Sequence, residues 1–283
     1  MANAHILFDP PSDAGTYSGG SWQRGLGSLK TTFPTEVARS TNLAATSTTF
    51  TVDLLFTRPL SMFALIANSF STTATIRIRV SDAANMAGPS LDVTIPAFRP
   101  NVAWGSMPWG AFPWDGFRED YQPGGATTFY KHAETVFGRY VRIDIADPAN
   151  AAGYVQIGRF MAGDAFVPKI NMAYGAALKF IDESAKSLSK GGQAWWDRKA
   201  KRRQITAQFP FLSEGEAYGA AYDLLNKLGL TGNLLFVYDP DDASAIVLRR
   251  TIYGGLAQLD DIVSASPSID YPYSWNLAIE ELL

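Results

Sequence analysis

The first half of the sequence alternates between apolar and polar positions with the period of two that is typical of β-strands. Ile76, Ile78 and Val80 alternate with Arg77 and Arg79, which predicts a strand with one buried and one solvated face. Further short strands are predicted at residues 51–56, 60–67, 91–96, 139–145 and 154–160, with a turn-compatible break between the first two. These strands and the turn residues between them predict a β-sandwich over residues 40–163.

The pattern changes over residues 164–283, where extended segments flank one stretch with helical spacing. Ser213 and Glu216 have the spacing of a capping box, and Gly229 is placed to end the helix. The apolar stripe of this helix comprises Ala217, Ala221, Leu224, Leu225 and Leu228. Strands are predicted at residues 195–212, 233–238, 246–255 and 274–282, with a turn at 239–242. This order predicts a small α+β domain.

The N-terminal segment lacks a sustained period. Residues 9–49 are rich in Gly, Ser, Thr and Pro, so an irregular leader is predicted over residues 1–39, lying on the surface or on a neighbouring subunit. The start has no basic segment followed by a long apolar run, so we expect no signal peptide. The longest apolar stretches fall short of the roughly 18 residues that a membrane span needs. We therefore expect synthesis in the cytoplasm and no membrane span.

Composition limits the classes of function. The chain has 283 residues, of which 47% are hydrophobic and 18% charged, so a folded protein of two domains is expected. A net charge of −3 argues against nucleic acid and anionic membranes as general partners. The sequence contains no cysteine, which excludes disulfides, thiolate metal sites and a cysteine nucleophile.

Three tryptophans lie at intervals of five in residues 104–117, WGSMPWGAFPWDGF. A buried aromatic side chain covers about 150–250 Å², so three exposed rings would match or exceed the largest apolar patch of a typical monomer, about 300–600 Å². The segment therefore packs on its own domain, on another subunit, or on a sugar. The residues assigned to this interface or candidate glycan contact are Trp104, Trp109, Trp114, Asp115 and Arg118.

Five basic side chains follow the tandem tryptophans Trp195 and Trp196. If these side chains bound nucleic acid, they would contribute a strong, salt-dependent electrostatic part of the affinity. No motif for reading a DNA groove accompanies them, so sequence-specific binding is not expected. A solvated or subunit-facing strand is the simpler interpretation. A more specific form of this interpretation has the strand face an acidic neighbouring subunit in a ring, or face DNA that passes down a tube. This basic interface strand comprises Arg198, Lys199, Lys201, Arg202 and Arg203.

Signatures of catalysis and metal binding are weak. His5 and His132 are the only histidines, and no nucleophile elbow, phosphate loop or zinc-protease motif is present. The four residues DPDD at 239–242 lack the spacing of a calcium loop, so they are interpreted as a turn. We assign no catalytic, cofactor-binding or metal-ligating residue and expect no enzyme. Because two carboxylates suffice for a glycosidase, a polysaccharide hydrolase is the second alternative, with Asp115 and Glu119 as the candidate pair.

The predicted sandwich resembles a galactose-binding-like jelly roll of the discoidin type. The words that carry the resemblance are FTVDLLFTRPLSMFALIAN, TIRIRVSD and FGRYVRIDIADPANAAGYVQIGRFMAGD, and the resemblance covers about residues 40–163. Domains of this class bind glycans through loops in some members and carry no ligand in others. The resemblance therefore implies a carbohydrate-binding module that recognises host-surface glycan as the alternative function.

Residues 164–283 resemble tail-tip and baseplate structural proteins of tailed bacteriophages. The words that carry this resemblance are FPFLSEGEAYGAAYDLLNKLG, LLFVYDPDD, RRTIYGGL and YPYSWNLAIEELL. It implies a distal tail protein of the virion that self-assembles into a ring or trimer and contributes to host attachment. Its expected partners are copies of itself and other tail proteins, namely the tube, hub and receptor-binding proteins.

Overall fold

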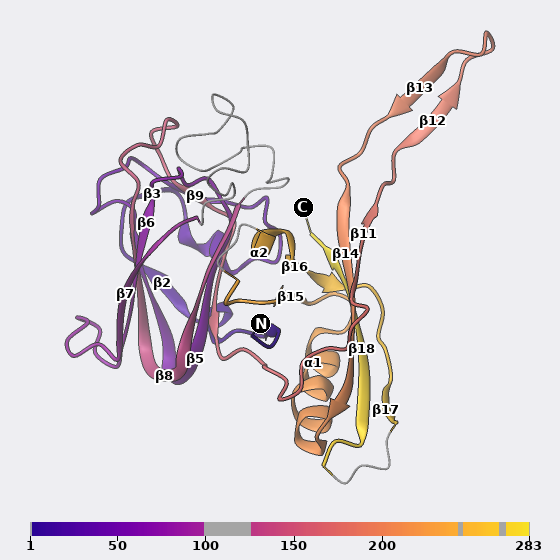
Figure 1. Cartoon of the computed structure of the whole chain (residues 1–283). Helices are drawn as coiled ribbons and strands as arrows, with labels where there is room; N and C mark the ends of the chain where they lie inside the picture. The colour runs from indigo at the N-terminus through magenta and orange to yellow at the C-terminus, as the bar shows by residue number, and fades with distance from the viewer. Residues whose placement is uncertain (1, 99–125, 243–245, 266–269, 283) are drawn as a thin grey trace, which may run out of the picture. The chain divides into compact units, whose positions relative to one another are not determined.

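The computed structural model describes residues 2–98, 126–242, 246–265 and 270–282. The chain forms two compact units (Figure 1). The first contains Met1–Val167 and Leu235–Thr251, and the second contains Pro168–Leu234 and Ile252–Leu283. The sequence predicted boundaries near residues 39 and 163, and no local pattern indicated that a later segment, Leu235–Thr251, belongs to the first unit.

The first unit is a β-sandwich built on two long antiparallel strands, β5 (Thr49–Asn68) and β8 (Ala126–Ala146). Among the described residues its larger sheet has the order β10-β5-β8-β6-β7, with β2 paired to β5, and a smaller sheet has the order β3-β4-β9. The remaining strands are β2 (Thr16–Ser18), β3 (Trp22–Arg24), β4 (Ala38–Ser40), β6 (Thr75–Ser81), β7 (Leu91–Pro96), β9 (Gln156–Ile157) and β10 (Arg159–Gly163). The prediction of a mainly β protein with an N-terminal sandwich is confirmed.

Strand β5 is continuous where the sequence predicted two strands. The expected break around Pro59 is instead an irregularity in the ladder, because Asp53 pairs with Tyr140 while Arg58 pairs with Gly138. Four residues of β5 thus stand opposite one residue of β8. A β-bulge of this kind bends a strand without ending it. Pairing with β8 resumes at Arg58 and Pro59, which stand opposite Gly138 and Phe137, so the proline lies inside the ladder.

The core of the sandwich is an aromatic cluster. The rings of Phe50 and Phe160 are both fully buried and meet edge to face, with their centroids 5.4 Å apart. Tyr17 and Trp22 contact Phe50, at centroid distances of 6.1 and 6.0 Å. On β6 the predicted alternation is confirmed: Ile76, Ile78 and Val80 are buried, whereas Arg77 is exposed and Arg79 half-buried.

The segment expected to be an irregular leader is instead part of the fold. It forms β1 (His5–Phe8), the 3₁₀ turns η1 (Pro11–Asp13) and η2 (Leu26–Lys30), and the short strands β2, β3 and most of β4. Leu29 is fully buried. Strands of three residues are too short to show a period in the sequence, and their place in the fold comes from pairing with distant strands.

The second unit contains a sheet with the order β16-β18-β14-β11, in which β17 also pairs with β18 (Figure 1). These strands are β11 (Ala177–Ile181), β14 (Arg202–Leu212), β16 (Thr251–Leu256), β17 (Ile262–Ser264) and β18 (Tyr273–Glu281). A π-helical turn (Glu216–Ala221) leads into α1 (Tyr222–Leu228). Because this is a single helical segment, the unit is mainly β and not clearly the α+β domain that we expected.

The helical segment begins and ends close to the predicted positions. Glu216 Oε2 accepts hydrogen bonds from the backbone N–H and the hydroxyl of Ser213, at 2.9 and 2.6 Å. Gly229 follows α1 with a φ of 52°, a conformation that glycine adopts without strain. Of the predicted stripe, Ala217, Ala221, Leu224 and Leu228 are buried and Leu225 is half-buried.

Residues 233–255 contain one confirmed and one incorrect prediction. β15 (Asn233–Val237) is completely buried, and Asp242 N–H donates to the carbonyl of Asp239 at 3.3 Å, so the expected strand and turn are present. Residues 246–255 were predicted as one strand, but α2 (Ile246–Arg249) precedes β16. Apolar runs this short do not separate helix from strand. No helix in the described part of the chain is long and apolar enough to span a membrane.

We expect Phe160→Ala to destabilise the first unit by about 3–5 kcal/mol, because truncating a buried aromatic side chain leaves a cavity in the core. Phe33→Ala is the control, since Phe33 is 60% exposed. Urea unfolding followed by circular dichroism measures both variants. Equal losses of stability in the two variants would contradict the assignment of Phe160 to the core.

Candidate interaction surfaces

The tryptophan-rich loop lies outside the described residues. Trp104, Trp109, Trp114, Asp115 and Arg118 all fall within residues 99–125. Packing on its own domain, on a subunit and on a sugar therefore all stay predictions for this loop.

The predicted basic strand is divided into two parts by its ion pairs. Arg203 lies on β14, and its guanidinium group binds the carboxylate of Glu281, which is only 7% exposed. The Nε atom of Arg203 donates to Glu281 Oε2 at 2.9 Å, and the Arg203 backbone N–H donates to the same oxygen at 3.0 Å. The Arg202 guanidinium contacts Glu183 and lies 2.5 Å from Glu280. These two arginines thus join β14 to acidic groups of their own unit.

The other three basic side chains are exposed. Lys201 Nζ lies 3.7 Å from Asp182, with the lysine side chain 64% exposed. Among the described residues, Arg198 and Lys199 take part in no ion pair. The five residues thus fall into two groups: Arg202 and Arg203 bind acidic groups of their own unit, whereas Arg198, Lys199 and Lys201 are exposed. Their role as an interface stays a prediction.

A two-stranded arm lies directly before Arg198 and Lys199 in the sequence. β12 (Ala185–Leu188) pairs with β13 (Ala194–Asp197), and Figure 1 shows the pair extending from β11 and β14 away from the rest of the second unit. Every residue from 185 to 200 is exposed. Trp195 and Trp196 are 60% and 57% exposed, and Leu188 is 66% exposed. We call residues 182–201 the arm.

The tandem tryptophans lie on opposite faces of the arm, because successive side chains of a strand alternate. Trp196 pairs across the ribbon with Lys186, whose Nζ lies 5.4 Å from the centroid of the indole ring. An isolated two-stranded hairpin is at best marginally stable in water. A surface that covered the arm would therefore stabilise it.

A second exposed apolar surface lies at the bulge of β5. Leu55 and Phe56 in the bulge are 46% and 66% exposed, and Phe137, which pairs with Pro59 just beyond it, is 58% exposed. We call these three residues the corner patch. Leu55 has a φ of 70°, a left-handed conformation that costs energy for a residue with a side chain. The bulge thus exposes apolar side chains to solvent, although the hydrophobic effect favours their burial.

Charged groups flank the corner patch. Asp53 accepts hydrogen bonds from Arg139 Nε and Nη2 at 2.7 and 2.8 Å, and these bonds lower the pKa of the Asp53 carboxyl. The guanidinium of Arg58 lies 5.6 Å from the centroid of the Phe56 ring. Aromatic rings beside fixed hydrogen-bonding groups are the chemistry that polar ligands with an apolar face require.

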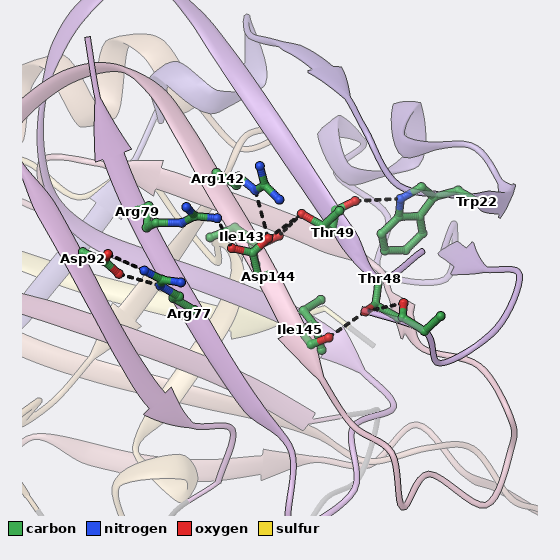
Figure 2. Close-up of polar contacts among 11 residues, drawn as sticks. Trp22, Thr48, Thr49, Arg77, Arg79, Asp92, Arg142, Ile143, Asp144 and Ile145 are labelled. Carbon is green, nitrogen blue, oxygen red and sulfur yellow. Dashed lines mark hydrogen bonds and ion pairs between the residues drawn. The ribbon is translucent and has the colours of Figure 1, made fainter. Parts of the chain in front are cut away.

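The outward face of the larger sheet carries a polar ladder (Figure 2). Arg77 donates two hydrogen bonds to Asp92, at 2.7 and 2.6 Å. Asp144 on β8 accepts from Arg79 at 2.6 Å, from Arg142 at 2.9 Å and from the Thr49 hydroxyl at 2.7 Å. Arg79 Nε has no hydrogen-bond partner in the described part of the chain. Both carboxylates nevertheless have guanidinium partners, so this face is a poor candidate for a ligand site.

The partners of Asp144 determine its protonation. Burial raises the pKa of the carboxyl, but the hydrogen bonds from Thr49, Arg79 and Arg142 outweigh burial, so the pKa is lowered overall. Asp144 is therefore charged at neutral pH and holds β5, β6 and β8 together across their outward face.

Both histidines have local partners. His5 Nδ1 lies 2.9 Å from the carbonyl of Asn3, and burial lowers the pKa of its imidazole. His132 Nδ1 lies 2.9 Å from the Tyr130 hydroxyl. Within the described residues, no group of three or more His, Cys, Asp or Glu side chains is placed to hold a metal ion.

The sequence reasoning missed the corner patch and the apolar part of the arm. For the arm a signal was present, because adjacent aromatics such as Trp195 and Trp196 in a strand cannot both face one core. The corner patch has no signal in the sequence, because Leu55 and Phe56 fit the pattern of an ordinary strand and are exposed at the bulge of β5.

No protein-family model and no curated protein matches this sequence. Among solved structures, the chain is similar to the CBM32-1 module of a family 31 glycoside hydrolase from Clostridium perfringens, with 12% identity and a TM-score of 0.36, covering 55% of this chain and 97% of that one. It is also similar to the family 32 carbohydrate-binding module of C. perfringens NanJ in complex with galactose, with 12% identity, a TM-score of 0.35 and coverage of 56% and 98%.

A fucose-binding module of Streptococcus pneumoniae is similar at 9% identity and a TM-score of 0.34, covering 55% of this chain and 95% of that one. The likeness to these β-sandwich modules is distant. At this level it does not identify what the chain binds, so a function has to be argued from the surfaces of the chain.

Removing the Arg203 guanidinium should destabilise the second unit far more than removing the charge of Lys201. Arg203→Ala leaves the carboxylate of Glu281 buried without its guanidinium partner and with only the backbone N–H of residue 203, a change that costs about 3–5 kcal/mol. Lys201→Ala breaks an exposed pair, which is worth about 0–1 kcal/mol. Thermal and urea unfolding of both variants measure the difference, and equal destabilisation would contradict the division of the basic strand into two parts.

Proposed function

We propose that the protein is a structural component that assembles with copies of itself through the arm. The observation that carries this proposal is the complete exposure of residues 185–200, with Trp195, Trp196 and Leu188 on a ribbon that no other described segment covers. Large aromatic side chains are enriched at the centres of protein interfaces. A ribbon with indole rings on both faces is best explained by burial between two protein surfaces.

The charges of the arm fit the same role. Arg198 and Lys199 are exposed beside the tandem tryptophans, which gives an aromatic centre with a basic rim. Charged rims improve orientation and association rate more than affinity. The proposal assigns no catalytic role to any residue.

The finer form of the proposal is a tail-tip or baseplate protein of a phage virion. Its support is the resemblance of residues 164–283 to such proteins and the presence of an arm suited to joining subunits. In this form the ring or trimer connects the tail tube to receptor-binding parts. Neither the solved structures described above nor the described surfaces favour a phage origin over another assembly.

Glycan recognition by the first unit is the second candidate function, and the corner patch favours it. Phe56 and Phe137 present exposed rings, and Asp53, Arg58 and Arg139 supply hydrogen-bonding groups beside them. A sugar binds such a surface by placing its apolar face on a ring and its hydroxyls on the charged groups. This candidate is compatible with assembly, because the two surfaces lie on different units.

We expect the double variant Trp195→Ser/Trp196→Ser to shift the protein from an oligomer to a monomer at micromolar concentration, measured by size exclusion with light scattering. The far-ultraviolet circular dichroism should stay nearly unchanged, since neither ring is buried within its own chain.

Phe33→Ser is the matched control, because Phe33 is equally exposed but lies in the first unit; its oligomer should remain intact. A wild-type chain that is monomeric at these concentrations would overturn the assembly proposal, as would an unchanged mass in the double variant.

For the second candidate, we expect wild-type protein to bind a subset of sugars on a glycan array and Phe56→Ala/Phe137→Ala to lose at least about tenfold in affinity, which corresponds to about 1.4 kcal/mol. Arg77→Ala is the control, because its guanidinium lies on the polar ladder away from the corner patch. Retained binding in the double variant, or no binding by the wild type, would remove this candidate.

A further inference from the structure

The sheet of the second unit has two open edges. β11 is the outermost strand beyond β14, and β17 is the outermost strand beside the first part of β18. No described strand pairs with the outer side of either one. An unpaired edge presents a row of backbone N–H and C=O groups that can accept a strand from another chain.

Both edges carry exposed apolar side chains. On β11, Leu178 and Phe180 are 46% and 62% exposed; at β17, Leu259 and Val263 are 52% and 49% exposed. Proteins normally protect an edge strand by making it short, charged or covered. Here both strands are short, but their apolar side chains remain uncovered by any described residue.

The two edges differ in charge. Residues 177–203 contain eight Lys or Arg and three Asp or Glu, a net charge of +5, although the whole chain has a net charge of −3. Residues 251–283 contain no Lys or Arg, and their five acidic residues are Asp260, Asp261, Asp270, Glu280 and Glu281. Arg202, Arg203 and Lys201 bind Glu183, Glu280, Glu281 and Asp182, so these charges are committed on both sides. Of residues 177–203, the basic groups left without an ion pair in the described part of the chain are Lys179 on β11 and four on the arm, whereas the acidic groups left lie mainly next to β17.

Asp260 in particular is incompletely satisfied. Its Oδ1 atom accepts a hydrogen bond from the Gln258 side chain at 2.5 Å, whereas Oδ2 is buried with no hydrogen-bond partner in the described part of the chain. On the opposite edge, Lys179 is exposed on β11. Pairing β11 with β11, or β17 with β17, would bring like charges together, whereas pairing unlike edges brings Lys179 towards Asp260 and Asp261.

We propose that β11 of one copy adds onto β17 of the next copy, so that the sheets of successive subunits become continuous. The occupant of each edge is therefore a second copy of this chain. The contact is head-to-tail, and repetition of a head-to-tail contact closes a ring when the rotation allows it. This inference rests on the proposed self-assembly and adds the surfaces by which it proceeds, separately from the tryptophans of the arm.

Cysteine cross-linking tests the pairing directly, because the chain contains no cysteine. A disulfide requires Cα atoms within about 7 Å. Within one chain, β11 and β17 are separated by β14 and β18, three strand spacings of about 4.8 Å each, so a bond inside one subunit is not expected. We expect the Phe180→Cys/Val263→Cys and Leu178→Cys/Val263→Cys chains, once oxidised, to give a ladder of multimers on non-reducing gels.

The single variants Phe180→Cys, Leu178→Cys and Val263→Cys are the matched controls and should remain single chains. A dimer formed by one single variant as readily as by the double variants would overturn the head-to-tail pairing and indicate contact between like edges. Absence of a ladder from both double variants, while the wild type is an oligomer by light scattering, would overturn this inference and leave the proposed function intact. A monomeric wild type would overturn both.

Charge reversal gives an independent test in the absence of cross-links. Lys179→Glu and Asp260→Lys/Asp261→Lys should each lower the fraction of oligomer at least about tenfold, and the combined triple variant should restore it. Arg24→Glu, an exposed reversal on β3 of the first unit, should have no effect. Oligomers that resist both reversals, or no recovery in the triple variant, would overturn the pairing of Lys179 with the acidic edge.

Discussion

The requirement that backbone N–H and C=O groups find partners determines much of this structure. In the first unit the long pair of β5 and β8 satisfies that requirement and supplies the frame to which β2, β6 and β10 attach. In the second unit the same requirement is met for β14 and β18 but left open at β11, at β17 and along the arm. The larger sheet of the first unit also ends in an edge strand, β7, but the edges of the second unit carry the exposed apolar side chains Leu178, Phe180 and Val263.

Ion pairs between side chains join the same strands that the backbone hydrogen bonds pair. Asp144 joins three strands of the first unit through Thr49, Arg79 and Arg142, and Glu281 fixes the start of β14 through Arg203. These carboxylates are committed to the fold, so they are unavailable to a partner. The charges that remain, such as Arg198, Lys199 and Asp261, lie where the backbone is also open, so open edges and uncommitted charges coincide.

The surfaces of the two units suit different tasks. The corner patch is a small aromatic surface with fixed polar groups, and it can take a small polar ligand without any change in the fold. The arm and the sheet edges offer extended backbone and large indole rings, which only another protein surface can cover. Assembly through the second unit and recognition through the first can therefore operate in one molecule. Variants of the arm tryptophans and of the corner-patch phenylalanines test the two roles independently.

The sequence by itself determined the alternation of β6, the strands β7 and β18, and the ends of the helical segment, because these depend on periods and caps within a few residues. It also identified the basic residues near Trp195 and Trp196. Only the tertiary structure decided that Arg202 and Arg203 bind their own glutamates, that residues 5–40 supply strands, and that Leu55 and Phe56 are exposed. Each of these depends on contacts between residues far apart in the chain, and the pattern of neighbouring residues does not indicate which distant residues will be partners.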